Sequence, residues 1–266
     1  MTRVVLNDPP LEVGGAAAHG ETLMARMLTA FSVATDGAGL VDYARLAGSP
    51  EFAAAAEAAR GLASVRLDTL TARGEKLAFW INVYNALVLH GIVGLGVRRS
   101  VARAWNFFGR AVYRIGGFLF SPDDVEHGVL RGNRRRVLPP PRPFGSRDPR
   151  CGFAISPLDP RIHFAINCGA RSCPPVDVYR AEAIESQLDL ATRGFVNTEV
   201  TLEDGRIVCS RLFKWYRRDF EAAGGLTAFL LHHLDDGPVR RALADAAGPR
   251  VGFRPWDWSL HRPAVE

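Results

Sequence analysis

The hydrophobic pattern of the first half predicts helices, and its longest apolar stretch covers residues 77–97. These 21 residues carry no charged side chain and are long enough to cross a membrane. However, Asn82, Asn85 and His90 lie inside the stretch, and amides are costly in lipid unless they are paired. We therefore expect a central helix buried in a protein core and no membrane span. Two further helices are expected before it, over residues 21–35 and 51–70.

The second half of the chain mixes short strand patterns with helices. Hairpins are predicted over residues 111–120 and 200–209, where apolar residues flank glycine-containing turns. After the first hairpin, Ser121 can cap a helix, Pro122 suits its first position, and Asp124 can complete a capping box. Further helices are expected over residues 179–196, from Ser210 onwards, and over residues 226–234 and 239–246.

Residues 133–160 interrupt this pattern. Clustered prolines forbid regular helix and sheet there, so we expect a long arginine- and proline-rich loop inserted into the fold. Order returns after this loop, where the alternation of Ile162, Phe164 and Ile166 predicts a strand.

These elements together predict an α+β fold. Its N-terminal helices, including the buried central helix, are expected to pack on a small, mainly antiparallel sheet. Residues 1–20 are expected to be an irregular N-terminal segment, and residues 21–266 a single domain. The contents of 47% hydrophobic and 23% charged residues are those of an ordinary soluble globular protein.

The net charge of +5 comes from one segment of the chain. Residues 131–150 hold seven arginines and one aspartate, whereas the remaining residues hold 26 bases and 27 acids. Nucleic acid is therefore not an expected partner. Four cysteines are too few for a disulfide scaffold, and the first 20 residues show no secretory signal. We expect a cytoplasmic setting with free thiols.

Cys168 is the first candidate for chemistry, because it lies where the predicted strand opens into a turn of small residues. A thiol beside Arg171 and unpaired loop amides can ionise and act as a nucleophile. The alternative is a buried cysteine that only fills space. Strand geometry favours His127 as its base, because His163 should face away from Cys168.

A third member is needed to orient the imidazole of His127. Glu126 precedes His127 directly, and adjacent residues of an α-helix point in different directions. The amides of Asn85 or Asn167 are therefore the expected partners. Asn82 and Asn85 share one helix face, where they either line a polar pocket or clamp a neighbouring loop.

A metal site is an alternative use of the same residues. Cys168 and Cys173 are separated by four residues, and His163 lies five positions before Cys168. A zinc ion would need a fourth ligand, for which His127 or Cys151 is available. One such pair of cysteines is weak evidence, so no metal and no other cofactor is expected.

Four strings between Lys76 and Phe220 occur in a characteristic order: KLAFWINVYNALVLHGI, SPDDVEHGVLRGN, DPRIHFAINCGARSCPP and CSRLFKWYRRDF. They resemble the successive signature blocks of the domain-of-unknown-function 547 family. The resemblance implies a set of characteristic polar positions but no assigned reaction. These positions are Asn82, Asn85, Glu126, His127, Arg131, His163, Asn167, Cys168, Arg171, Ser172 and Cys173.

The leading hypothesis is a thiol-dependent hydrolase or acyltransferase acting on an amide or ester, with a small molecule or peptide as substrate. The alternatives are a non-enzymatic interaction module with a structural polar cluster, and the metal site. The oligomeric state is left open. The expected catalytic residues are Cys168, His127, Asn85, Asn167 and Glu126, and the expected substrate-binding residues are Asn82, Arg131, His163, Arg171 and Ser172.

Overall fold

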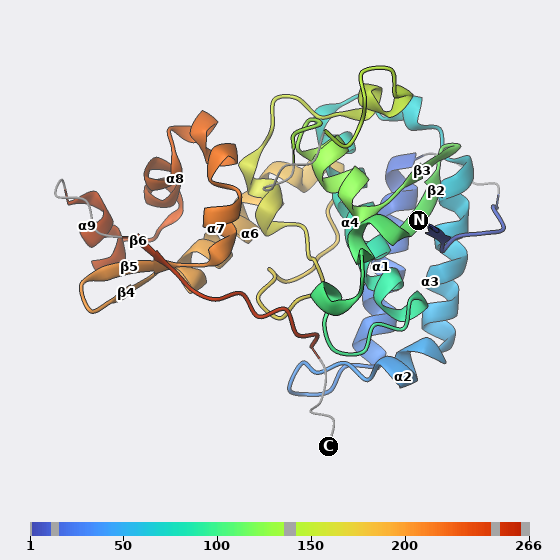
Figure 1. Ribbon diagram of the computed structural model, residues 1–266, viewed down its shortest axis with the longest axis horizontal. Helices are drawn as coiled ribbons and strands as arrows, with labels where there is room; N and C mark the ends of the chain where they lie inside the picture. The colour runs from blue at the N-terminus through green and yellow to red at the C-terminus, as the bar shows by residue number, and fades with distance from the viewer. Residues whose placement is uncertain (1, 12–15, 136–141, 246–250, 262–266) are drawn as a thin grey trace.

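The computed structural model describes residues 2–11, 16–135, 142–245 and 251–261 (Figure 1). Helices dominate the first third of the chain, and two small sheets join further helices after it. The α-helices are α1 (Ala16–Val33), α2 (Tyr43–Ala47), α3 (Pro50–Arg60), α4 (Arg73–Gly94), α5 (Phe107–Arg110), α6 (Ile184–Glu199), α7 (Arg211–Trp215), α8 (Leu226–His233) and α9 (Pro238–Ala244). The strands are β1 (Val4–Val5), β2 (Ala111–Ile115), β3 (Phe118–Phe120), β4 (Thr201–Glu203), β5 (Arg206–Cys209) and β6 (Val251–Phe253).

Helix α4 is the centre of the larger hydrophobic core. Every residue from Leu77 to Ile92 is buried. Helix α1 packs along α4, and α3 packs against α1. Helix α4 is also long and apolar enough to cross a membrane, but 89% of its most apolar window is buried inside the protein. The expected buried central helix is therefore confirmed.

Both predicted hairpins form, and each belongs to a separate three-stranded sheet of mixed direction. Strand β2 pairs with β3 in antiparallel and with β1 in parallel orientation. Strand β5 likewise pairs with β4 in antiparallel and with β6 in parallel orientation. The fold is α+β as expected. The sequence pattern did not predict the third strand of each sheet, because β1 and β6 are only two and three residues long. Strand β1 and the start of α1 at Ala16 also bring regular structure into the segment expected to be irregular.

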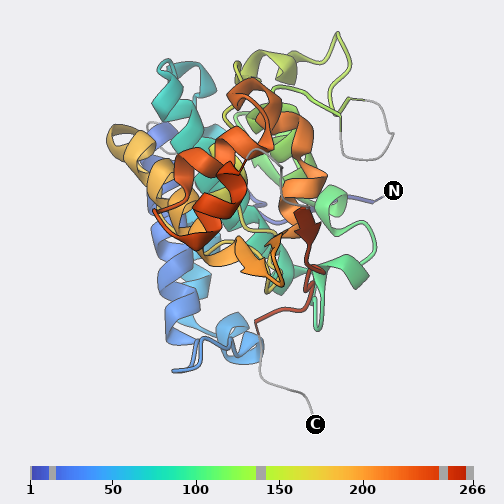
Figure 2. The same ribbon diagram turned by 90° about the vertical axis from the view of Figure 1, so that its left-hand side faces the viewer.

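The C-terminal third packs around a second cluster of aromatic side chains, which includes Phe164, Phe213 and Phe220. Figure 2 looks from the side of these C-terminal elements and shows them in front of the helices of the first half. After β6, the chain runs back to the first half (Figure 1). There the amide of Leu260 donates to the carbonyl of Arg99 at 3.0 Å, and the amide of Val41 donates to the carbonyl of His261 at 2.9 Å. These bonds join the C-terminal segment to the first half of the chain, while the single-domain division stays a prediction.

The arginine- and proline-rich loop at 133–160 is more ordered than expected in its described part. It contains a 3₁₀ helix, η5 (Pro149–Phe153), and the side chain of Phe144 is buried against Phe120. The side-chain amide of Asn133 holds both backbone polar groups of Phe144, at 3.0 Å each. Apolar residues within the loop therefore contribute to the core. Residues 136–141 lie outside the described residues.

The strand predicted from Ile162, Phe164 and Ile166 is wrong. This segment begins with a 3₁₀ helix, η6 (Pro160–Phe164), which the Asp159 side chain caps. Every residue from Ile162 to Ile166 is buried, so the alternation does not mark one core face and one solvent face. The expected directions of His163 and Cys168, which rested on a strand, no longer apply.

Candidate functional site

The segment that carries Glu126 and His127 is a π-helix, η4 (Asp124–Leu130). The predicted capping box is present: the amide of Asp124 donates to Oγ of Ser121, and the amide of Ser121 donates to a carboxylate oxygen of Asp124. The amide of Arg131 then bonds to the carbonyl of Glu126, five residues back, at 2.8 Å. Such wide turns are rare and frequently occur at functional sites.

Arg131, directly after η4, joins this helix to the C-terminal third of the chain. Its guanidinium donates to Asp219 through two nitrogens, from Nε to Oδ2 at 2.6 Å and from Nη2 to Oδ1 at 3.1 Å. Asp219 lies in the 3₁₀ helix η8 (Arg217–Ala223). Both side chains are almost fully buried. Burial alone would raise the pKa of Asp219, but hydrogen bonds from His163 and Arg131 hold it well below its usual range.

His163 is fixed by the same carboxylate. Its Nε2 lies 2.9 Å from Oδ2 of Asp219, and its ring stacks on Tyr216 with 3.9 Å between the ring centres. Burial lowers the pKa of His163, against the raising effect of Asp219, so the ring is neutral. Because a carboxylate only accepts, Nε2 carries the proton and Nδ1 is deprotonated. Nδ1 is buried and has no hydrogen-bond partner among the described residues.

His127 contacts a different nitrogen of Arg131 from the two that bind Asp219. Its Nδ1 lies 2.9 Å from Nη1 of Arg131, and arginine only donates, so Nδ1 accepts and Nε2 carries the proton. Burial lowers the pKa of His127 and keeps the ring neutral. Nδ1 also lies 3.4 Å from Oε1 of Glu126. Because Nδ1 accepts from Arg131, it has no proton to donate to Glu126, and the expectation that Glu126 does not orient its own neighbour stays a prediction.

Glu126 is held by two tyrosines from different parts of the chain. Tyr216 donates its hydroxyl to Oε1 at 2.5 Å, and Tyr84 of α4 donates to Oε2 at 3.3 Å. Burial alone would raise the pKa of Glu126, but the hydrogen bond from Tyr216 and the charge of Arg131 keep it below its usual value. Glu126 is therefore an ionised carboxylate inside the network.

We call the side chains of Glu126, His127, Arg131, His163, Tyr216 and Asp219 the polar network. It brings together four of the expected site residues, and two further members escaped the sequence reasoning. The expected members are Glu126, His127, Arg131 and His163, and the unexpected ones are Tyr216 and Asp219. Both unexpected residues lie in the CSRLFKWYRRDF string. The resemblance therefore pointed to this segment, but not to these two positions within it.

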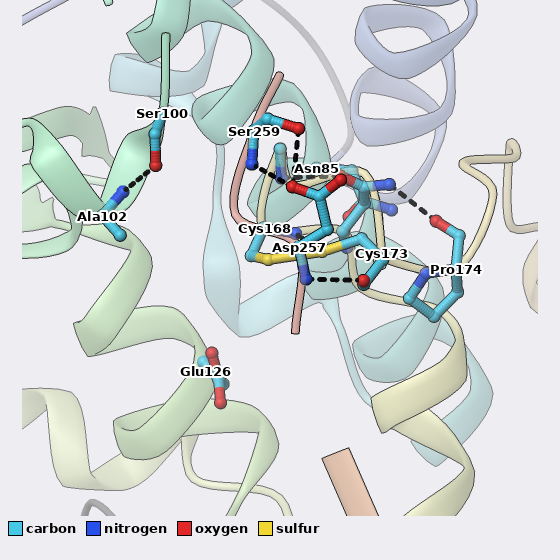
Figure 3. The surroundings of a disulfide bond; sticks show 12 residues. Asn85, Ser100, Ala102, Glu126, Cys168, Cys173, Pro174, Asp257 and Ser259 are labelled. Carbon is cyan, nitrogen blue, oxygen red and sulfur yellow. Dashed lines mark hydrogen bonds between the residues drawn. A yellow bond between two sulfur atoms is a disulfide. The ribbon is translucent and has the colours of Figure 1, made fainter. Parts of the chain in front are cut away.

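Cys168 and Cys173 form a disulfide in the turn that follows η6 (Figure 3). The expectation of a free thiol at Cys168 does not match this structure. The backbone amide of Cys168 also bonds to Sγ of Cys173 at 3.1 Å. No hydrogen bond joins Cys168 to His127 within the part of the chain that the structure describes. Their closeness therefore stays a prediction.

The zinc site considered as an alternative has no counterpart in residues 2–11, 16–135, 142–245 and 251–261. No group of three or more histidine, cysteine, aspartate or glutamate side chains is arranged there to hold a metal ion. The two cysteines of the predicted zinc set are bonded to each other.

Asn82 and Asn85 clamp neighbouring loops. The amide of Asn82 bonds to both backbone polar groups of Tyr179, at 2.7 and 2.9 Å. Nδ2 of Asn85 donates to the carbonyl of Ala165 at 2.9 Å, and its Oδ1 accepts the amide of Asn167 at 2.8 Å. The oxygen of Asn85 therefore serves the backbone, not the imidazole of His127.

Asn85→Leu is expected to destabilise the protein although leucine is the better helix former. The replacement leaves the carbonyl of Ala165 and the amide of Asn167 without partners, which costs about 1–3 kcal/mol. Urea unfolding of both proteins measures the difference. An unchanged or raised free energy of unfolding would contradict this clamp.

The other expected residues of the turn also hold the backbone. Asn167 donates to the carbonyl of Pro174 at 2.6 Å and accepts the amide of Gly169 at 2.7 Å. Oγ of Ser172 accepts the amide of Asp257 at 2.9 Å. The backbone amide of Arg171 bonds to the carbonyl of Ser259, while its side chain is exposed. These contacts fix the turn against the returning C-terminal segment.

The fold and the site define a mixed α+β protein in which a buried polar network links a π-helix to the C-terminal third. Residues 67–196 match the model of a family described as "Protein of unknown function, DUF547". This part of the chain belongs to that family, which confirms the resemblance seen in the sequence. The match covers Glu126, His127, Arg131 and His163, and Asp219 lies beyond it. No curated protein and no solved structure matches the chain.

Proposed function

We propose that the protein is an enzyme that hydrolyses or transfers an acyl group held as an amide or ester, with His163 as its general base. One observation carries the proposal: Nδ1 of His163 is buried and has no hydrogen-bond partner among the described residues, while Asp219 holds Nε2. An imidazole oriented by a carboxylate, with its second nitrogen bare, is the arrangement that removes a proton from a nucleophile.

In the proposed reaction, Nδ1 of His163 accepts a proton from water or an acceptor alcohol. The nucleophile's oxygen forms a bond to the acyl carbon. The carbon–oxygen or carbon–nitrogen bond to the leaving group then breaks, and the leaving group takes the proton back from His163. Asp219 keeps its charge throughout and stabilises the transient imidazolium, as Arg131 keeps the pKa of this carboxylate low.

His127 has a complementary role in this proposal. Its Nε2 carries the proton when Nδ1 accepts from Arg131. This N–H can donate to the oxyanion that develops on the substrate carbonyl. The side chains of His127 and Glu126 keep 8% and 10% of their surface exposed, whereas His163 keeps none. The substrate therefore reaches the network from the side of His127.

Cys168 takes no part in this reaction, because its sulfur is bonded to Cys173. The thiol-dependent mechanism would apply only after reduction of that bond. A cytoplasmic setting, where such bonds are rare, remains a prediction that the state of these two sulfurs in the cell would test.

Hydrolysis of p-nitrophenyl acetate and of an acyl p-nitroanilide tests the proposal. We expect turnover by the wild-type protein and by the double variant Cys168→Ser/Cys173→Ser, and loss of turnover in His163→Gln. Activity that appears only with reductant and disappears in the double variant would instead support the thiol-dependent mechanism.

A second candidate is a non-enzymatic module in which the network is structural. This candidate is favoured because Arg131 and Asp219 neutralise each other's charge within the network, through two hydrogen bonds. In that case His163→Gln and the wild-type protein would be equally inactive toward both substrates, and the variant would differ only in stability.

A further inference from the structure

A pocket of about 360 Å³ lies outside the polar network, on the loop that follows α4. Its lining comes from one stretch of chain, residues 95–110, which includes α5. That stretch holds four arginines and neither aspartate nor glutamate. The pocket is in the size range of small-molecule sites.

The four arginines, Arg98, Arg99, Arg103 and Arg110, all line the pocket and are all exposed. The side chains of the last three form no ion pair or hydrogen bond with another described residue. Elsewhere in the fold, by contrast, Arg131, Arg150 and Arg161 each meet a carboxylate. Guanidinium groups gathered around a hollow without a carboxylate favour an anionic ligand, and their planar fork matches phosphate oxygens.

Trp105 lines the same pocket and is 70% exposed. An indole left in water beside guanidinium groups offers a flat apolar face that a ring can cover. A ligand that satisfies both features carries phosphate groups and a planar ring. A membrane surface would share the phosphate chemistry, but a concave site of this size fits a single small molecule better than a lipid layer.

The loop is held in shape before any ligand binds. Oγ of Ser100 accepts the amide of Ala102 at 3.2 Å (Figure 3). Phe107 is buried, and Gly91 of α4 leaves room for its ring, because a Cβ there would lie 3.2 Å from it. Leu260 of the C-terminal segment bonds to Arg99 through the backbone. Anchoring of this kind lowers the conformational entropy that binding would cost.

From these observations, we infer that the pocket at 95–110 binds a phosphorylated ligand with a planar ring, of which a nucleoside diphosphate is the simplest example. The arginines bind the phosphates, and Trp105 stacks on the ring. This site is independent of the reaction proposed for His163.

Calorimetric titration of the full-length protein with ADP, pyrophosphate and adenosine tests the inference. We expect ADP to bind more tightly than either fragment, and its affinity to fall as salt rises. Arg99→Gln/Arg103→Gln should weaken ADP binding at least about tenfold, because hydrogen bonds to charged groups are lost. Arg241→Gln, which removes an exposed arginine from α9, is the control and should bind as the wild type does.

Trp105→Ala tests the ring separately. It should weaken ADP about tenfold while leaving pyrophosphate unchanged, and Trp105→Phe should restore ADP binding. Absence of ADP binding by the wild type, or equal binding by the double arginine variant, would overturn the inference. Binding to vesicles that contain phosphatidic acid, without binding to ADP, would also overturn it and point to a membrane surface.

Discussion

Asp219→Ala is expected to lower the free energy of unfolding by about 3–5 kcal/mol. The change removes the carboxylate that binds Arg131 through two nitrogens and His163 through one. The positive charge of Arg131 is then left buried without this counter-charge, which is the costly way to break a buried ion pair. Urea unfolding at neutral pH measures the loss.

Asp235→Ala is the matched control. Asp235 also pairs with an arginine, Arg193, but both side chains are more than half exposed. An exposed pair of this kind contributes at most about 1 kcal/mol. Equal losses of unfolding free energy in the two variants would show that the buried Asp219 pair stabilises the protein no more than the exposed pair does.

The contribution of Asp219 also has a defined pH dependence. Its pKa in the folded protein lies below the unfolded value of 3.8, so its stabilisation is complete above about pH 4. It is lost as the pH falls below that value toward the folded pKa. The part of the difference in unfolding free energy that comes from the Asp219 carboxylate should therefore shrink only as the pH falls below about 4.

His163→Gln is expected to lower the rate of ester or amide hydrolysis by about 10²–10⁴-fold, the usual contribution of a general base. Glutamine keeps an N–H donor for Asp219 but offers no basic nitrogen, so the fold should be retained. The rate constant kcat and the unfolding curve are measured on the same preparation.

His232→Gln serves as the control for this variant, because His232 is exposed on α8 and lies outside the network. It should keep the full rate. A similar rate in His163→Gln and the wild type would remove His163 from the reaction. A large loss of stability in His163→Gln alone would favour the structural module.

The sequence predicted the elements whose signals are local. The uncharged run of α4 and the capping box of Ser121 and Asp124 depend on residues close together in the chain, and both are present. Four of the positions that the family resemblance supplied, Glu126, His127, Arg131 and His163, meet in one network, while their roles stay a prediction.

Other features could not be predicted because they depend on distant contacts or unusual turns. Asp219 lies 88 residues after Arg131, and no spacing rule connects them. Glu126 and His127 lie in a π-helix, which no sequence pattern used for α-helices predicts. The strand expected at Ile162 failed because burial on all sides hides the difference between helix and strand periodicity.

Nitrogen NMR of the histidine side chains tests the central claim most directly, which is that Asp219 holds a neutral His163 with a bare Nδ1. The account predicts a proton on Nε2, none on Nδ1, and no protonation of this ring until the pH falls below the usual histidine value of 6.5. A proton on Nδ1, or a charged His163 ring at neutral pH, would contradict the account.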